Sequence, residues 1–231
     1  MAKTAVLVDG GFYRKRARSL WGKKSPDERA DELNRYVFEH LSKKDGPSER
    51  ELYRVFYYDC PALKKTVYHP LLRRNIDFGK LESYKWTNDF FDELKTKRKF
   101  ALRMGRLSDN GSCYILHNDK LKKICAGTIK VDDLTETDFH ISFKQKGVDM
   151  KLGIDVASLA DDGIVDQIIL IAGDSDFVPA AKYARRHGID FILDPMGISI
   201  NDDLLEHIDG LESFLKHDPC ANRGADDGGR P

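Results

Sequence analysis

The stretch that decides the fold runs from Leu170 to Leu193 and reads LIAGDSDFVPAAKYARRHGIDFIL. It begins within one apolar run, which starts at Ile168, and it ends with a second apolar run, which finishes at Leu193. Continuous apolar runs, without alternation, are typical of strands that are covered on both faces. We therefore predict a strand, a helix and a second strand joined by a right-handed crossover, so that the two strands are parallel. The predicted bounds are 167–172, 177–187 and 191–193.

The rest of the chain repeats this alternation of strands and helices. A short buried strand, Thr4–Val8, ends at Asp9, and an amphipathic helix follows it. The other predicted elements are strands at 51–60 and 99–107, short strands near 114–116 and 141–143, a helix that starts near Val148 and a last helix around 202–216. The pattern predicts the α/β class, with a mainly parallel central sheet flanked by helices.

Length and composition limit the organisation. The 231 residues are enough for one sizeable core. We expect one domain over residues 1–217, with a less regular middle segment at about 61–146, and a disordered, Gly-rich tail over 218–231. The formal net charge is zero, so contact with nucleic acid would need a local basic patch.

Targeting signals are not recognisable in the sequence. The apolar run at the N-terminus is shorter than an export signal needs, and no stretch reaches the roughly 20 apolar residues of a membrane span. The four cysteines form no CxxC pair. We expect a reduced, cytoplasmic protein without a membrane partner; the oligomeric state, including a homo-oligomer, is left open.

Carboxylates follow two of the predicted strands. Asp9 ends the first strand, and Asp174 and Asp176 follow the strand 167–172. In an open parallel sheet the active crevice lies beyond the carboxyl ends of the strands. Several carboxylates at short range repel one another, and a hard divalent cation relieves that repulsion. Such a cation can activate water and neutralise a phosphodiester.

A purely structural interpretation of these acids is open as well. Ser175 or Asp176 could cap the helix that opens at Phe177, since Ser and Asp are preferred at that position. Asp9, which precedes two glycines, could be a turn residue. The occurrence of acids at two strand ends favours the functional interpretation.

A further pair of acids lies in the helix that starts near Val148. At about 100° per residue, apolar side chains cover an arc of roughly 240°, and Asp149 falls inside it. Asp155 falls at the edge of the arc, where a surface pair with Lys151 is the alternative to a metal-binding role. A carboxylate in an inward-facing arc needs a partner, so Asp149 is the better candidate ligand.

Three segments carry a resemblance to a known family. VLVDGGF, KGVDMKLGIDV and ILIAGDSDFVPAAKYARRHG resemble the NYN domain, a branch of the PIN-like nucleases that includes the LabA-like bacterial proteins. The resemblance implies a Rossmann-like PIN fold in which a cluster of acids binds Mg²⁺ or Mn²⁺ and hydrolyses phosphodiester bonds, usually of RNA, with metal-activated water. The implied catalytic and metal-binding acids are Asp9, Asp149, Asp174 and Asp176, with Asp155 as a further metal ligand.

One departure from the family pattern supports a second hypothesis about the function. Many members carry Asn shortly after the first Asp, where this sequence has Gly11 and Phe12. The first hypothesis is a divalent-metal-dependent ribonuclease that acts on single-stranded RNA. The alternative is an RNA-binding or regulatory NYN module with little or no turnover.

A nuclease also needs contacts to its substrate. The basic run RKRAR follows the first strand directly, so Arg14 and Arg16 are the preferred phosphate contacts. Ser175, between the two acids of GDSDF, is the third candidate substrate contact. Charge runs are usually solvated helix faces, which is the alternative for each of the basic clusters.

Overall fold

The computed structural model describes residues 1–42, 50–108 and 111–215. The chain forms two compact units. The first, which we call the sheet unit, consists of Met1–Asp59, Asp89–Gly105 and the chain from Gly147 onward. The second, the hairpin unit, consists of Cys60–Asn88 and Arg106–Lys146. The middle segment that the sequence marks as less regular therefore supplies most of a unit of its own.

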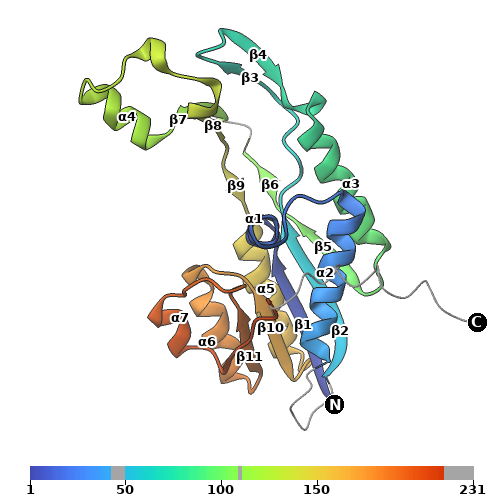
Figure 1. Cartoon of the computed structure of the whole chain (residues 1–231). Helices are drawn as coiled ribbons and strands as arrows, with labels where there is room; N and C mark the ends of the chain where they lie inside the picture. The colour runs from blue at the N-terminus through green and yellow to red at the C-terminus, as the bar shows by residue number, and fades with distance from the viewer. Residues whose placement is uncertain (43–49, 109–110, 216–231) are drawn as a thin grey trace, which may run out of the picture. The chain divides into compact units, whose positions relative to one another are not determined.

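The sheet unit is built on a parallel sheet (Figure 1). In the described residues this sheet has six strands in the order β12-β11-β10-β1-β2-β5, and each neighbouring pair is parallel. The predicted α/β class with a parallel central sheet is thus confirmed. The strands are β1 (Ala2–Asp9), β2 (Arg50–Asp59), β5 (Phe100–Met104), β10 (Gln167–Ile171), β11 (Asp190–Asp194) and β12 (Gly210–Leu211).

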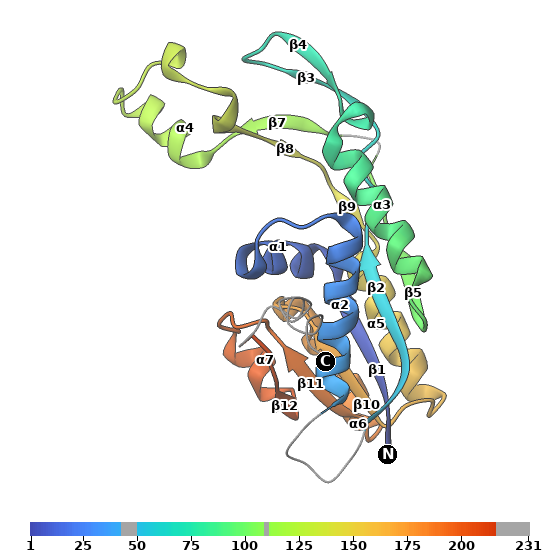
Figure 2. The ribbon, with the colours of Figure 1, turned by 45° about the vertical axis from the view of Figure 1, so that its right-hand side comes forward.

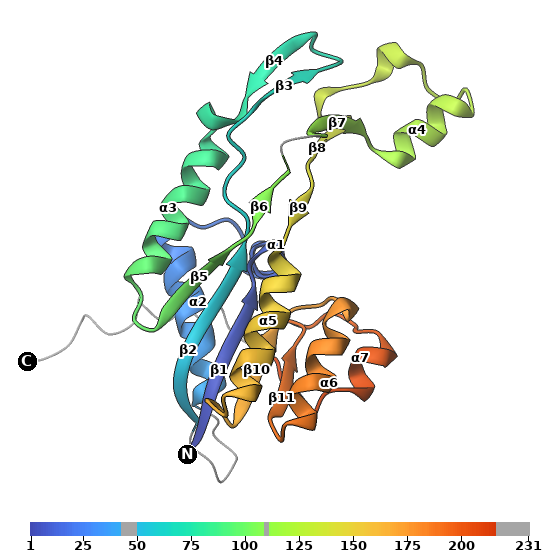
Figure 3. The same cartoon turned by 180° about the vertical axis from the view of Figure 1, so that it is seen from behind.

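Helices cover both faces of this sheet, as Figure 3 shows for α5 and α6 on the near face, with α2 behind. The near face is packed by α5 (Val148–Asp161), α6 (Val178–Arg186) and α7 (Asp202–Glu206). The helices α1 (Gly10–Trp21), α2 (Pro26–Leu41) and α3 (Glu82–Thr96) complete the set around the sheet, with α3 residues in both units.

Burial on both faces explains the continuous apolar runs of the central strands. In β1, Ala5 and Leu7 join the core under α5 and α6, while Val6 and Val8, which point to the other face, are also fully buried. All five residues of β10 are buried. The polar residues that follow these strands mark the point where the sheet ends, and they therefore lie at one edge of the core.

The hairpin unit contains small antiparallel sheets. They are β3 (Thr66–His69) with β4 (Arg74–Asp77), β6 (Arg106–Leu107) with β9 (Gln145–Lys146), and β7 (Cys113–Leu116) with β8 (Phe139–Ser142). Short helical segments are η1 (Phe78–Lys80), α4 (Asn118–Cys125), η2 (Val131–Asp133) and η3 (Glu136–Asp138). The buried His69 packs against Tyr114 and Phe139, with ring centroids 4.1 and 5.3 Å apart.

Some element predictions need correction. The last helix was expected to reach residue 216, but α7 ends at Glu206 and the edge strand β12 follows it. The helix α1, which starts immediately after β1, was not expected; it is visible beside the sheet in Figure 2. The predicted tail, 218–231, lies outside the described residues. Within the described part of the chain, no helix is long and apolar enough to cross a membrane.

Candidate active site

The candidate site lies at the topological switch point of the sheet. From β1 the chain adds β2 and β5 on one side, and it later adds β10, β11 and β12 on the other. Val8 pairs with Ile171, so the ends of β1 and β10 lie next to each other. Asp9 is the last residue of β1, and two residues, Ala172 and Gly173, separate β10 from Asp174. Ligands of open α/β sheets bind in the crevice at such a point.

Asp9 has an electrostatic environment that opposes its ionisation. Burial, followed by the negative charges of Asp59 and Asp149, raises its pKa to about 6. The opposing contribution is a hydrogen bond at 3.0 Å from the Phe12 N–H to Oδ1, which makes Asp9 the N-cap of α1. Asp9 therefore lies near two other carboxylates and is already a helix cap.

Asp149 connects Asp9 with the two acids after β10. It lies in the first turn of α5 and is exposed. Its pKa is raised by partial desolvation and, after that, by the negative charges of Asp174 and Asp176. Asp149 also raises the pKa of Asp9. The four acids that the sequence predicts as site residues are thus electrostatically connected at one edge of the sheet.

The capping interpretation accounts for only some of these acids. Asp174 Oδ1 accepts a hydrogen bond at 3.0 Å from the Asp176 N–H and caps the short helix η4 (Ser175–Phe177), which precedes α6. The cap is therefore Asp174, not Ser175 or Asp176. The side chains of Asp149 and Asp176 have no hydrogen-bond or ion-pair partner within the described residues. Two carboxylates thus remain without a partner, and both lie in the first turn of a helix, where a negative charge is favourable.

The four acids do not form a closely spaced ligand set in this structure. Among described residues, the group whose ligand atoms all lie within 4.8 Å of one another is Asp203, Glu206 and His207, at and just after α7. His207 Nε2 lies 3.5 Å from an Asp203 oxygen, so this group already contains an ion pair when the histidine is protonated.

Asp155 has structural partners of its own. Its Oδ2 accepts hydrogen bonds from Tyr58 Oη and from Arg103 Nε, each at 2.8 Å. The ion pair is thus with Arg103 of β5 and not with Lys151. Its role as a metal ligand stays a prediction, and of the five predicted ligands it is the one held by an ion pair.

The buried face of α5 is narrower than the arc predicted from the helical wheel. Met150 and Ile154 were placed inside the arc, but they are 72% and 58% exposed. The buried face is narrower and consists of Leu152, Val156, Leu159 and Ala160. Asp149 is exposed because it lies at the N-terminal end of the helix, beyond the strand ends.

Asp59 was not among the predicted site residues. It ends β2 and is 2% exposed. The Arg14 Nη2 atom lies 3.0 Å from Oδ1 and 2.9 Å from Oδ2, and Tyr57 Oη donates to Oδ2 at 3.2 Å. The signal was available, because the sequence shows β2 ending on an acid just as β1 does.

The predicted substrate contacts are partly occupied by intramolecular bonds. Arg14 is paired with Asp59, as described above, and its guanidinium lies 5.9 Å from the Phe91 ring centroid. Arg16 donates from Nε and Nη2 to the Met196 carbonyl oxygen, at 3.3 and 2.7 Å. Ser175 is half-buried in η4. A phosphate would have to compete with these bonds at both arginines.

Phe12 takes part in packing at the site. A Cβ atom at Gly173 would lie 2.6 Å from both Phe12 Cε2 and Ile198 Cδ1, so any larger residue before Asp174 would have to displace these side chains. Gly10 is restricted in the same way, because a Cβ there would lie 2.5 Å from Cζ of Tyr57. The position where many family members have Asn is therefore filled by an aromatic ring against the Asp174 turn.

Fold and site together define an α/β protein with acids gathered at the switch point of a parallel sheet. The family model of the NYN domain matches residues 89–203, about half of the chain, and this part of the chain is an NYN domain of the PIN-like nuclease superfamily. NYN domains are generally nucleases, PIN-like nucleases typically use divalent metals, and RNA is the substrate class that the family implies. The matched residues include Asp149, Asp174 and Asp176 but not Asp9. The LabA-like branch stays a prediction.

Comparison with curated proteins gave no match. Among solved structures, a protein of unknown function from Vibrio parahaemolyticus is similar, with a TM-score of 0.47 and 13% identity over 92% of this chain and 93% of that one. This likeness carries no conclusion about function.

Proposed function

We propose that the protein is a divalent-metal-dependent ribonuclease that hydrolyses phosphodiester bonds of single-stranded RNA. The observation that carries the proposal is the electrostatic coupling of Asp9, Asp149, Asp174 and Asp176 at the switch point of a sheet that belongs to an NYN-family chain. Carboxylates that repel one another oppose their own ionisation, and a cation bound between them would offset this repulsion.

The residues fit a hard divalent cation such as Mg²⁺ or Mn²⁺. The donors are carboxylate oxygens only, which both ions prefer. Asp149 and Asp176 are exposed and unpaired within the described residues, so they are available to bind. Asp174 has one oxygen engaged in its cap. A cation held by these acids would supply an activated water and offset the charge of the phosphodiester.

The other residues would orient this arrangement. Asp9 holds the start of α1 through its cap, and the Arg14 guanidinium balances the charge of Asp59 next to it. The closely packed Gly173 and Phe12 fix the turn that presents Asp174. These contacts position the acids and leave the exposed side of the site to the substrate.

Turnover of labelled single-stranded RNA with Mn²⁺ or Mg²⁺, compared with EDTA, tests the proposal. The wild-type protein should cleave only with the metal, and an identically purified Asp174→Asn variant should be inactive. Equal cleavage by both proteins would show that the activity does not come from this site.

The alternative function is an RNA-binding or regulatory NYN module with little turnover. The packing of Phe12 against the Asp174 turn favours it, because an apolar ring stands where the family usually has a polar amide. RNA binding without metal-dependent cleavage by the wild-type protein would establish this alternative.

A further inference from the structure

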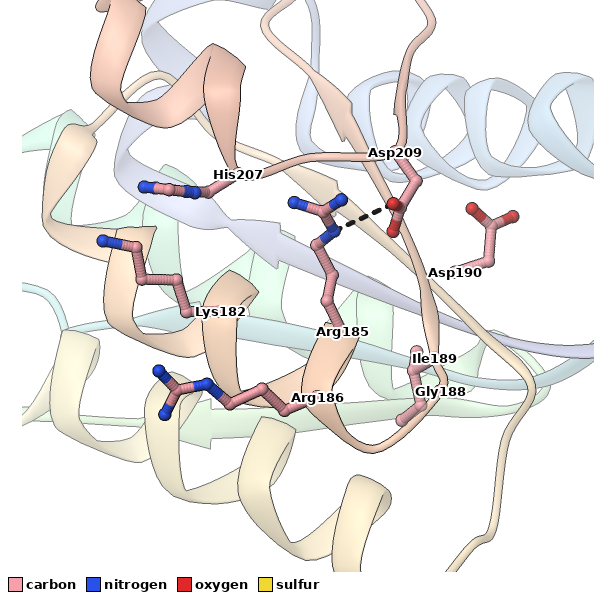
Figure 4. Close-up of a pocket in the computed structure, with 8 residues that line it drawn as sticks. All are labelled: Lys182, Arg185, Arg186, Gly188, Ile189, Asp190, His207 and Asp209. Carbon is pink, nitrogen blue, oxygen red and sulfur yellow. Dashed lines mark hydrogen bonds and ion pairs between the residues drawn. The ribbon is translucent and has the colours of Figure 1, made fainter.

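An open groove of about 720 Å³ lies beside the C-terminal half of α6 (Figure 4). It is lined by α6, by the turn that leads from α6 into the first residue of β11, and by His207 and Asp209 between α7 and β12. The ionisable side chains in its lining are Lys182, Arg185, Arg186, Asp190, His207 and Asp209. The groove is separate from the acids at the carboxyl ends of the strands, since Asp190 begins β11.

The acids of the groove are occupied by internal bonds. Asp209 accepts from Arg185 Nε at 2.8 Å and from the Phe191 N–H at 2.9 Å. Asp190 accepts from the Gln167 side-chain amide. Neither carboxylate therefore depends on Lys182 or Arg186 for a partner.

Lys182 and Arg186 are exposed cations without a counter-charge. No hydrogen bond or ion pair joins either of them to another described residue. They are four residues apart on α6, so their side chains are neighbours on one face of the helix. Figure 4 shows their nitrogen ends on the same side of the groove as the His207 ring. Two adjacent unpaired cations repel each other, and an anionic ligand would relieve that repulsion.

The same helix connects this pair with the acids. Val178, Ala181 and Ala184 form the buried face of α6, whereas Pro179 shares an exposed flank with Lys182 and Arg186. At 1.5 Å per residue, Arg186 lies about 12 Å along the axis from Val178. The flank therefore leads from the short helix capped by Asp174 to the groove.

We propose that the groove binds phosphates of the same single-stranded RNA whose scissile bond lies at the acids. The inference rests on the proposed function and deepens it. A cluster of carboxylates repels a polyanion, and the chain's net charge of zero provides no long-range attraction. Cations near the acids are therefore needed to hold the RNA strand. RNA carries a row of phosphates, so one strand can lie at the acids and also contact the cations of the groove.

The test compares two double variants that each remove two positive charges. The groove variant is Lys182→Gln/Arg186→Gln. The control is Lys122→Gln/Lys123→Gln on α4, where both lysines are exposed and unpaired among the described residues. Binding of a short, fluorescent single-stranded RNA is measured by anisotropy over a salt series, in an Asp174→Asn background that prevents cleavage.

We expect the groove variant to bind RNA about tenfold more weakly at low salt, with a log–log salt slope flatter by about 1.4, or roughly 0.7 per lost phosphate contact. The control should match its parent. In an active background, KM should rise for the longer RNA, while cleavage of a dinucleotide, too short to reach the groove, should not change.

Other results would overturn the inference. They are an unchanged slope in the groove variant, an equal loss in both variants, or displacement of the RNA by polyglutamate at equal charge, which would assign the groove to an acidic protein. If wild type cleaves RNA and the groove variant binds RNA as wild type does, the groove is not an RNA site, whereas the proposed function stands. Binding that the groove variant loses, without cleavage by wild type, supports the groove as an RNA site and refutes the proposed function.

Discussion

Replacing Asp9 by Asn should stabilise the metal-free protein at neutral and alkaline pH. Asp9 has a pKa of about 6 in the folded chain against an ordinary value of 3.8. The folded state therefore holds the proton more tightly than the unfolded state. The associated stability is fully present below pH 3.8 and is lost as the pH rises through about 6.

The size of the effect follows from the same pKa. At 1.36 kcal/mol per pKa unit, ionised Asp9 costs about 3 kcal/mol of unfolding free energy above pH 6. Asn has no charge to desolvate and keeps an oxygen that can accept from the Phe12 N–H, so the helix cap survives. We expect Asp9→Asn to gain 1–3 kcal/mol (order of magnitude) at pH 8 in EDTA and almost nothing at pH 4.

Urea unfolding followed by circular dichroism at both pH values measures this difference. The matched control is Asp89→Asn, since Asp89 is exposed and has no partner among the described residues. Saturating Mn²⁺ should make wild type more stable than Asp9→Asn. A cation present at a hundred times its Kd stabilises the folded wild type by about 2.7 kcal/mol, and it should stabilise the variant by less. If Asp9→Asn is no more stable than wild type at pH 8 in EDTA, burial and the neighbouring carboxylates do not oppose the ionisation of Asp9 as inferred.

Other substitutions separate the roles of the remaining acids. Asp174→Asn should abolish metal-dependent RNA cleavage while circular dichroism stays native, because Asn can keep the cap of η4; full activity would exclude the site. Asp149→Ala should remove activity with little change in the urea midpoint, whereas Asp155→Ala should cost about 1–3 kcal/mol, since Arg103 and Tyr58 lose a shared acceptor; the reverse pattern would refute these assignments. Asp59→Ala should cost about 3–5 kcal/mol in urea unfolding because it leaves a half-buried Arg14 unpaired.

The sheet and the candidate acids were predictable for different reasons. Two-sided burial gives β1 and β10 unbroken apolar runs, and acids after such runs mark the edge of the core. Asp59 also follows an apolar strand, but its partner Arg14 lies 45 residues away, and no local sequence pattern reveals that ion pair.

Other features depend on tertiary contacts that a sequence pattern does not contain. The helix α7 ends early because it buries only Leu204 among the described residues, and Gly210 then pairs with Ile192 at the sheet edge. Only the side of α5 that packs on the sheet is buried, and a helical wheel does not show how wide that side is, which is why Met150 and Ile154 are exposed. The strands of the hairpin unit are two to four residues long; the sequence predicts β7 and β8 near 114–116 and 141–143, whereas β3, β4 and β9 are too short for a periodicity to be recognised.

The position of β1 in the sheet has a consequence for biosynthesis. β1 is synthesised long before its neighbour β10, which begins at Gln167, so one edge of β1 stays unpaired until that later segment has been made. An uncovered apolar edge is prone to pair with other chains, and such distant pairing is slow. Asp149, Asp174 and Asp176 also arrive with this late segment. A nascent chain therefore holds Asp9 without the acids that complete the cluster, and no finished site exists before the sheet that carries it has closed.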